Sequence, residues 1–151
     1  MKVCIGGTFN SLHKGHKLLI DKAFEVAGKR GSVFIGITTG EITKEKSDVR
    51  SFEKRKRTIE QYLHEKSFIE RAVVKPITDK YGPSVKDDFD SIVISPETRK
   101  TAEEINKKRK QNGKKPLEII QIPFVLAEDG CPISSSRIRK YEIDEDGRLL
   151  S

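Results

Sequence analysis

The sequence predicts an α/β fold in which helices cover both faces of one doubly wound parallel sheet. Short apolar runs suited to strands alternate along the chain with longer stretches whose apolar residues recur at helical spacing. Glycine and proline mark the boundaries between these runs. Because parallel neighbours must be joined by crossover connections, five strands that alternate with helices indicate a five-stranded parallel sheet.

Five apolar runs predict the strands. The clearest of them, SVFIGIT, is apolar enough to be buried on both faces, as strands of parallel sheets are. The run SIVISPET joins a strand to a helix start, because Ser95 can cap a helix whose first position is Pro96. The expected strands cover residues 2–5, 32–38, 70–77, 91–94 and 117–125.

Four amphipathic stretches predict the helices. One ends at Gly28, and another has Phe52, Ile59, Tyr62 and Leu63 on its inner face. The basic residues of this second helix are expected to face solvent by default. The expected helices cover residues 14–27, 51–65, 96–112 and a stretch that starts at residue 133.

Length and charge narrow the class of protein. At 151 residues and without an internal repeat, the chain is expected to form a single domain over residues 1–151. Its 30 Lys and Arg against 23 acids give +7, which suits nucleic acid, a membrane surface or a polyanionic small molecule. A basic nucleic-acid-binding domain is the weaker alternative, because the basic runs EKRKR and NKKRKQNGKK fall on amphipathic helices and aromatic residues are only 7%.

The sequence lacks the features expected of a secreted or membrane-spanning protein. No apolar run approaches the roughly 20 residues needed to span a bilayer, and the chain starts with a strand-like run instead of a secretory signal. Cys4 and Cys131 have no C-x-x-C spacing, so reduced buried thiols are expected. We therefore expect a cytoplasmic protein without a membrane or nucleic-acid partner, while the oligomeric state stays open.

The stretch GGTFNSLHKGH, residues 6–16, lies between the first strand and the first helix. Ligands of such sheets bind beyond the carboxyl ends of the strands, where the strand order reverses. Gly6 and Gly7 leave room for a phosphate, and the helix after them is expected to offer unpaired N–H groups. His13 and His16 can face the same phosphates, and Gly15 between them is expected to open access. The spacings of the P-loop and of the dinucleotide fingerprint are both absent, and a third zinc ligand is not evident nearby.

These residues carry a resemblance to a known family. GGTFNSLHKGH resembles the T/HxGH signature of the nucleotidylyltransferase superfamily, and ISSSRIR is similar to its second signature, ISSTxxR. ITDKYGP and VISPETRKTAEEIN resemble the archaeal type of phosphopantetheine adenylyltransferase, so the resemblance covers nearly the entire chain. It implies a Rossmann-like nucleotidylyltransferase fold. Asn10 stands where most relatives carry aspartate, and Ser136 where threonine is usual.

The resemblance implies that the adenylyl group of ATP is transferred to 4′-phosphopantetheine, giving dephospho-coenzyme A and pyrophosphate. A phosphomonoester has its second pKa at about 6, so it is an anion at neutral pH and can attack the α-phosphate without a protein nucleophile. Mg²⁺ is expected, bound mainly through the ATP phosphates. The alternative is another small-molecule nucleotidylyltransferase of the cytidylyltransferase or FAD synthetase type, although EDGCPISSS stands where the first carries an RTEGISTT-like stretch.

The resemblance also implies roles at the reacting phosphates. Thr8 would bind the attacking phosphate, and His13 would contact the nucleotide phosphates. His16 would act catalytically by stabilising charge on the α-phosphate. Lys44 matches the catalytic lysine that bridges the two substrates, with Lys46 as the alternative.

Further residues would bind the nucleotide. Gly7 and Phe9 would shape its pocket, and the serines of the second signature would offer hydroxyls and helix amides to the β- and γ-phosphates. One or two of four cations should reach the triphosphate, and Arg139 matches the arginine of the motif. The serines are Ser134, Ser135 and Ser136, and the cations are Arg99, Lys100, Arg137 and Arg139. Asp79, Tyr81 and Gly82 match a loop of the family, but a simple turn explains them equally well.

Overall fold

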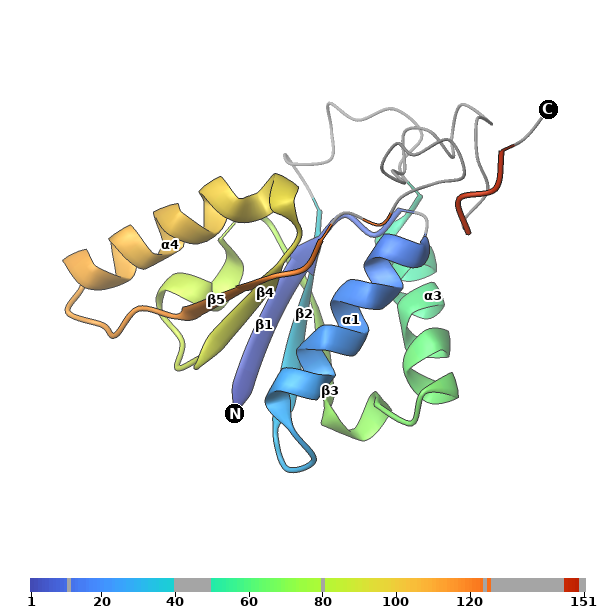
Figure 1. Cartoon of the computed structure of the whole chain (residues 1–151), viewed down its shortest axis with the longest axis horizontal. Helices are drawn as coiled ribbons and strands as arrows, with labels where there is room; N and C mark the ends of the chain where they lie inside the picture. The colour runs from blue at the N-terminus through green and yellow to red at the C-terminus, as the bar shows by residue number, and fades with distance from the viewer. Residues whose placement is uncertain (11, 40–49, 80, 124, 126–145, 150–151) are drawn as a thin grey trace.

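A computed structural model of the chain describes residues 1–10, 12–39, 50–79, 81–123, 125 and 146–149. Within them a sheet of 5 strands has the order β3-β2-β1-β4-β5, and each neighbouring pair is parallel (Figure 1). The chain moves outward from β1 to β3 and then returns to place β4 beside β1, so the predicted doubly wound parallel sheet is confirmed. The strands are β1 (Lys2–Gly7), β2 (Ser32–Thr38), β3 (Ala72–Ile77), β4 (Ser91–Ile94) and β5 (Glu118–Gln121).

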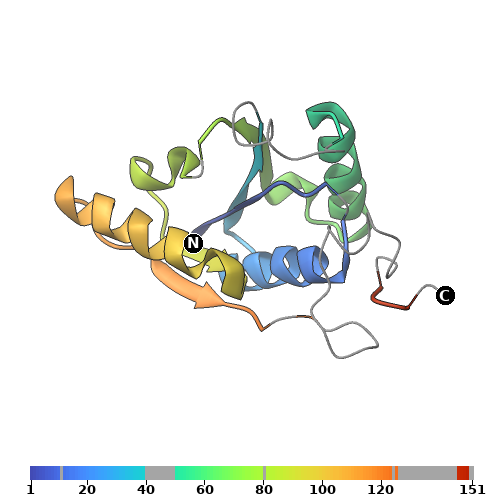
Figure 2. The same ribbon diagram turned by 90° about the horizontal axis from the view of Figure 1, so that it is seen from above.

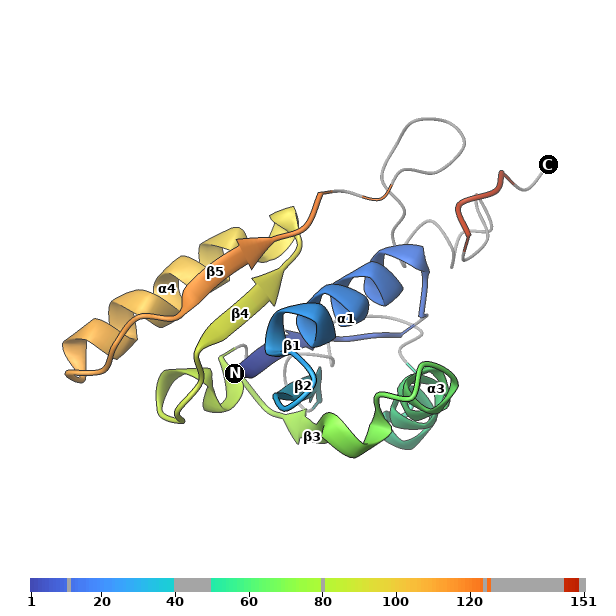
Figure 3. The ribbon, with the colours of Figure 1, turned by 60° about the horizontal axis from the view of Figure 1, so that its bottom comes forward.

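Helices cover both faces of the sheet. One face packs against the first two long helices and the other against α4 and η2, which Figure 2 and Figure 3 show from two directions. The helical elements are α1 (Lys14–Ala27), α3 (Phe52–Glu65), η1 (Ile69–Arg71), η2 (Gly82–Val85), η3 (Pro96–Thr98) and α4 (Arg99–Gln111).

Alternation along the strands divides the apolar core in two. Val3 and Ile5 face α1 and α3, whereas Cys4 between them faces α4 and η2. Burial raises the pKa of the Cys4 thiol to about 12, and this free thiol lies 3.7 Å from the Ser91 carbonyl oxygen. The buried central strands place their carboxyl ends together at one edge of the sheet.

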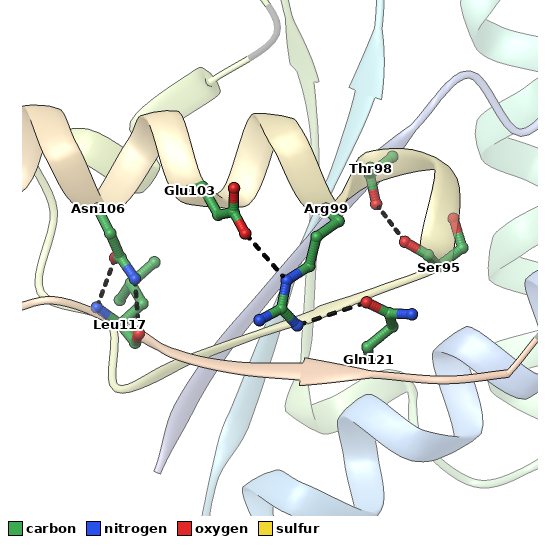
Figure 4. A network of polar contacts seen from close by, with 7 residues as sticks. All are labelled: Ser95, Thr98, Arg99, Glu103, Asn106, Leu117 and Gln121. Atoms are coloured by element: carbon green, nitrogen blue, oxygen red, sulfur yellow. Dashed lines mark hydrogen bonds and ion pairs between the residues drawn. The ribbon is translucent and has the colours of Figure 1, made fainter.

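The helix expected from Pro96 begins later than predicted. Pro96 starts a 3₁₀ turn, and Ser95 makes no side-chain cap. Instead the Ser95 carbonyl accepts hydrogen bonds from the amide and the hydroxyl of Thr98, both at 3.1 Å (Figure 4). These i to i+3 bonds tighten the turn, so regular α-helix starts only at Arg99.

The last expected strand is shorter than predicted. Its ladder ends at Gln121, although the Ile122 amide still donates to the Ile94 carbonyl at 2.8 Å. Pro123 has no N–H and cannot extend the pairing. The helix expected from residue 133 lies outside the described residues, as does Cys131. No helix in the described part of the chain is long and apolar enough to cross a membrane.

One basic residue of α3 contradicts the expectation that all of them face solvent. The Arg55 side chain is buried, and the residue is only 3% exposed. Its guanidinium is held by three backbone carbonyl oxygens, which replace the water that such a group would otherwise need. This arginine therefore belongs to the architecture beneath the candidate site.

Candidate active site at the carboxyl edge of the sheet

A cleft of about 630 Å³ opens beside the carboxyl ends of β1 and β4. It lies where the strand order reverses, at the edge that Figure 2 views from above. Gly7, Thr8 and Phe9 line it together with His13 and His16. The structure thus brings the residues of the first signature together at one ligand-sized cavity.

His13 caps α1 with its side chain. Its Nδ1 accepts hydrogen bonds from the amides of Gly15 at 3.0 Å and His16 at 3.3 Å. These two amides are therefore already paired, so they are not among the unpaired N–H groups expected at the start of this helix. With Nδ1 acting as acceptor, the neutral ring carries its proton on Nε2.

Burial also keeps His13 neutral. The residue is 8% exposed, and desolvation lowers the pKa of its imidazole to about 4. At neutral pH this ring can offer a hydrogen bond from Nε2 without carrying a full positive charge. Because His13 lines the cleft, such a donor suits contact with an anionic ligand.

His16 is positioned by its neighbours. Its Nδ1 accepts from the amide of His13 at 3.4 Å, which completes a reciprocal capping box and leaves Nε2–H as the donor. The two imidazole rings stack with centroids 3.7 Å apart, and the Phe9 ring lies 5.0 Å from that of His16. Phe9 itself is 2% exposed, so it supports His16 mainly from within the core.

Gly15 has a different role from the one expected. A Cβ at this position would lie 2.8 Å from Cε1 of the His13 ring and 3.1 Å from Nδ1. Glycine therefore makes room for the capping imidazole, and it does not merely open access to the cleft.

The His13 cap makes stability depend on pH. The folded state has a pKa of about 4 at this residue, below the ordinary 6.5, so only the unfolded state takes up a proton between these values. We expect the free energy of unfolding to fall by up to about 3 kcal/mol as the pH drops through this window. Urea titrations of wild type and His13→Asn measure the difference. Asparagine can cap the helix but cannot titrate, so a His13→Asn variant with the same pH dependence as wild type would contradict this assignment.

Thr8 stands where β1 and β2 separate. Its hydroxyl lies 3.0 Å from that of Thr38, and its carbonyl accepts a hydrogen bond from Arg55 at 2.9 Å. The sequence interpretation missed both Thr38 and Arg55. The position of each residue could have indicated it. Thr38 stands at the end of an apolar strand, and Arg55 lies three residues after Phe52, which is helical spacing and places it on the inner face of α3.

Asn10 holds the backbone at Arg50, just before α3. Its Oδ1 accepts a hydrogen bond from the Arg50 amide at 2.7 Å, and the residue is 5% exposed. This contact needs an oxygen acceptor and not a negative charge. Asparagine can therefore fill this role as well as the aspartate that the resemblance would lead us to expect at this position.

The loop after β3 forms a turn beside the cleft that is held by the Asp79 side chain. Asp79 Oδ1 accepts from the amides of Tyr81 at 2.9 Å and Gly82 at 2.8 Å. Gly82 has φ of 54°, and a Cβ there would lie 2.9 Å from Ile77. Tyr81 lines the cleft and its hydroxyl donates to Glu104 at 2.7 Å. The turn explanation is sufficient for Asp79 and Gly82, while Tyr81 also forms part of the cavity wall.

Arg99 lies apart from the cleft lining. Its Nε contacts Glu103 at 3.3 Å, and its terminal nitrogen contacts Gln121 at 3.4 Å across to β5 (Figure 4). The side chain is 48% exposed. These two contacts use two of the five N–H donors of the guanidinium.

Several predicted site residues lie outside the part of the chain that the structure describes. They are Lys44, Lys46, Ser134, Ser135, Ser136, Arg137 and Arg139. Among the described residues, no three His, Cys, Asp or Glu side chains are grouped to hold a metal ion. Glu97 is the one carboxylate in the described lining of the cleft. These described groups do not form a metal cage.

Comparison with known proteins identifies this arrangement. The cytidylyltransferase-like family model matches residues 4–141. A phosphopantetheine adenylyltransferase of Methanosarcina mazei is 47% identical over 98% of this chain and 96% of its own length. The chain belongs to the archaeal phosphopantetheine adenylyltransferases of the cytidylyltransferase-like family. A family member from Archaeoglobus fulgidus is 40% identical, covering 99% of this chain and 100% of its own.

Solved structures agree with the family fold. A crystal structure of a protein of unknown function from Archaeoglobus fulgidus has a TM-score of 0.73 and 36% identity, over 81% of this chain and 89% of that one. A pantoate-beta-alanine ligase from Francisella tularensis has a TM-score of 0.61 at 15% identity, covering 92% of this chain and 65% of that one. The second likeness concerns the fold alone.

Proposed function

We propose that this chain transfers the adenylyl group of ATP to 4′-phosphopantetheine, forming dephospho-coenzyme A and releasing pyrophosphate. The near-full-length relationship to archaeal phosphopantetheine adenylyltransferases carries this proposal. A cleft at the strand-order reversal, lined by two imidazoles and the Gly7–Phe9 turn, supports it.

The chemistry needs positioning and no protein nucleophile. An oxygen of the acceptor phosphate forms a bond to the α-phosphorus of ATP, and the bond from that phosphorus to the bridging β-phosphate oxygen breaks. Its electron pair leaves with pyrophosphate. Because the acceptor is already an anion near neutral pH, no proton has to be removed from it. The task of the protein is to align the two anions and to stabilise the charge that builds between them.

The described residues suit this task. Thr8 offers a hydroxyl to the attacking phosphate, and His13 offers Nε2–H to the nucleotide phosphates. His16 points its donor at the α-phosphate, where charge develops. Gly7 leaves the strand end without a side chain, although a Cβ there would lie 3.3 Å from Phe9. These two histidines are held by packing and mutual hydrogen bonds before any substrate arrives, which is what preorganised stabilisation requires.

The other contacts with ATP are proposed from the sequence signatures. Lys44 would bridge the two substrates, and Ser134, Ser135, Ser136 and Arg139 would bind the β- and γ-phosphates. Mg²⁺ would be held mainly by the triphosphate and water, and when bound it would neutralise phosphate charge. The absence of a carboxylate cage among the described groups is compatible with that mode of binding.

Tyr81 gives the cleft a partly exposed aromatic wall. It lines the cleft from the loop after β3, while Ile94, Ala102 and Ile105 lie behind the cleft on the side of α4 and are at most 3% exposed. The pantetheine arm combines two amides with a branched hydrocarbon group, so we propose that it packs against Tyr81 while its phosphate reaches the end of the cleft that carries Thr8.

A pyrophosphate-release assay over paired substrates tests the proposal. We expect ATP with 4′-phosphopantetheine to turn over fastest and CTP to be poor with the same acceptor. The assay also includes the substrate pairs of FAD synthetases and of cytidylyltransferases for comparison. Faster turnover of CTP with glycerol phosphate would place the chain elsewhere in the superfamily.

A further inference from the structure

Arg55 is a buried cation that forms no ion pair with another described residue. It lies on the inner face of α3 and is 3% exposed. Its Nε donates to the Arg50 carbonyl at 2.8 Å, and one terminal nitrogen donates to the carbonyls of Thr8 at 2.9 Å and Thr38 at 2.7 Å. Within the described residues, no carboxylate forms an ion pair with it.

Those carbonyls mark the point where the central strands part. The parallel register of β1 and β2 ends with Gly7 opposite Ile37. Thr8 follows the last residue of β1 and Thr38 is the last residue of β2, and Arg55 joins their carbonyl oxygens through one nitrogen. The guanidinium thus bridges the two chains just beyond the last registered pair, while the Thr8 and Thr38 hydroxyls lie 3.0 Å apart.

Packing alone does not account for an arginine at this place. Burial of a guanidinium costs free energy that a leucine or methionine of similar volume would not. The three hydrogen bonds offset this cost only while all three carbonyl oxygens stay within reach of the planar guanidinium group. The guanidinium therefore restricts the backbone at Thr8, and the Thr8 hydroxyl depends on that backbone for its position.

We propose that Arg55 is a positioning residue for adenylyl transfer, which fixes the Thr8 hydroxyl toward the attacking phosphate by holding the separated ends of β1 and β2. This inference rests on the proposed function. Arg55 does not touch the substrates and acts through Thr8.

Arg109 provides a matched control in the second core. It is also 3% exposed, and it donates to the carbonyls of Lys115, Ser84 and Asp87, each at 2.8 Å. The two arginines thus have the same burial and the same three-carbonyl geometry. Only Arg55 is bonded to the turn that carries Thr8.

The experiment compares Arg55→Lys with Arg109→Lys. An ammonium on a flexible stem cannot reproduce the planar guanidinium, so both variants should lose stability to a similar extent in urea titrations. With both substrates saturating and the rate corrected for the folded fraction, we expect Arg55→Lys to lower kcat by about 10- to 100-fold, the cost of misplacing a reacting group by about 1 Å. Arg109→Lys should stay within about twofold of wild type, and the KM for ATP should change by less than about threefold in both.

A double-mutant cycle shows whether Arg55 acts through Thr8. In a Thr8→Val background the hydroxyl is gone, so adding Arg55→Lys should cost less than about threefold in kcat. Full additivity of the two losses, or a folded Arg55→Lys enzyme with the kcat of wild type, would overturn the inference. Arg55→Gln repeats the comparison should the lysine variant not fold. Lack of adenylyl transfer by the wild type would instead refute the proposed function, so the two failures are distinguishable.

Discussion

His16→Ala lowers kcat by about 10²–10³, the range typical of losing one preorganised donor to developing charge. The affinity for ATP changes far less, because a contact that strengthens in the transition state affects kcat and kcat/KM together. Steady-state kinetics and equilibrium ATP binding on the same preparation measure both effects. His64→Ala is the matched control, since His64 is an exposed histidine in the last turn of α3.

The geometry also separates this role from a structural one. His16 contributes to the cap of α1 only through the long 3.4 Å bond from the His13 amide, whereas His13 accepts two bonds. We therefore expect His16→Ala to cost less stability than His13→Ala, whose lost cap is worth about 1 kcal/mol. A stable His16→Ala enzyme with nearly full activity would contradict the mechanism. A large fall in melting temperature with an unchanged rate per folded molecule would assign His16 to structure.

If Lys44 bridges the two substrates as proposed, Lys44→Ala lowers kcat by about 10² or more, because the bridging cation stabilises the charge that builds up between the reacting phosphates during transfer. Lys46→Ala should have a much smaller effect, and together the two variants locate the bridging lysine. The comparison uses kcat at saturating ATP and 4′-phosphopantetheine. If Lys44→Ala kept the rate of wild type while Lys46→Ala lost it, the role would pass to Lys46.

Both flanks of residues 40–49 are attached at the edge of the sheet where the cleft lies. The amide and hydroxyl of Thr39 donate to the Ile77 carbonyl at 2.8 Å and 3.2 Å. The Arg50 amide donates to Asn10 at 2.7 Å, and the Arg50 carbonyl accepts from Arg55 at 2.8 Å. Thr39 and Arg50, the described residues on either side of positions 40–49, therefore both lie beside the candidate site.

Strong periodicity explains why much of the fold could be predicted. The first helix was expected over residues 14–27 and forms over Lys14–Ala27, because its apolar residues repeat at helical spacing and Gly28 follows them. The sheet could be predicted because buried strands were separated by helices long enough for crossovers. The ligand edge then followed from the general rule for doubly wound sheets.

The predictions from sequence were wrong where a polar side chain forms hydrogen bonds with backbone groups. Arg55 falls on the inner face of α3 by spacing, but a default rule for charged residues placed it in solvent. Three carbonyls that become available only in the folded sheet reverse that preference. The His13 cap was missed for a related reason, since the motif suggested a phosphate contact and gave no sign that Nδ1 pairs with two amides. Sequence identified the residues of this turn, and only the tertiary structure shows how they hold one another.

Isotope transfer into the products tests the central claim most directly. The enzyme is given ATP and 4′-phosphopantetheine labelled with ¹⁸O in its phosphate, and both products are analysed by mass spectrometry. Adenylyl transfer to the acceptor phosphate predicts that all of the label appears in dephospho-coenzyme A and none in pyrophosphate, because every acceptor oxygen remains in the new diphosphate. Labelled pyrophosphate, or AMP as the released nucleotide, would contradict the account.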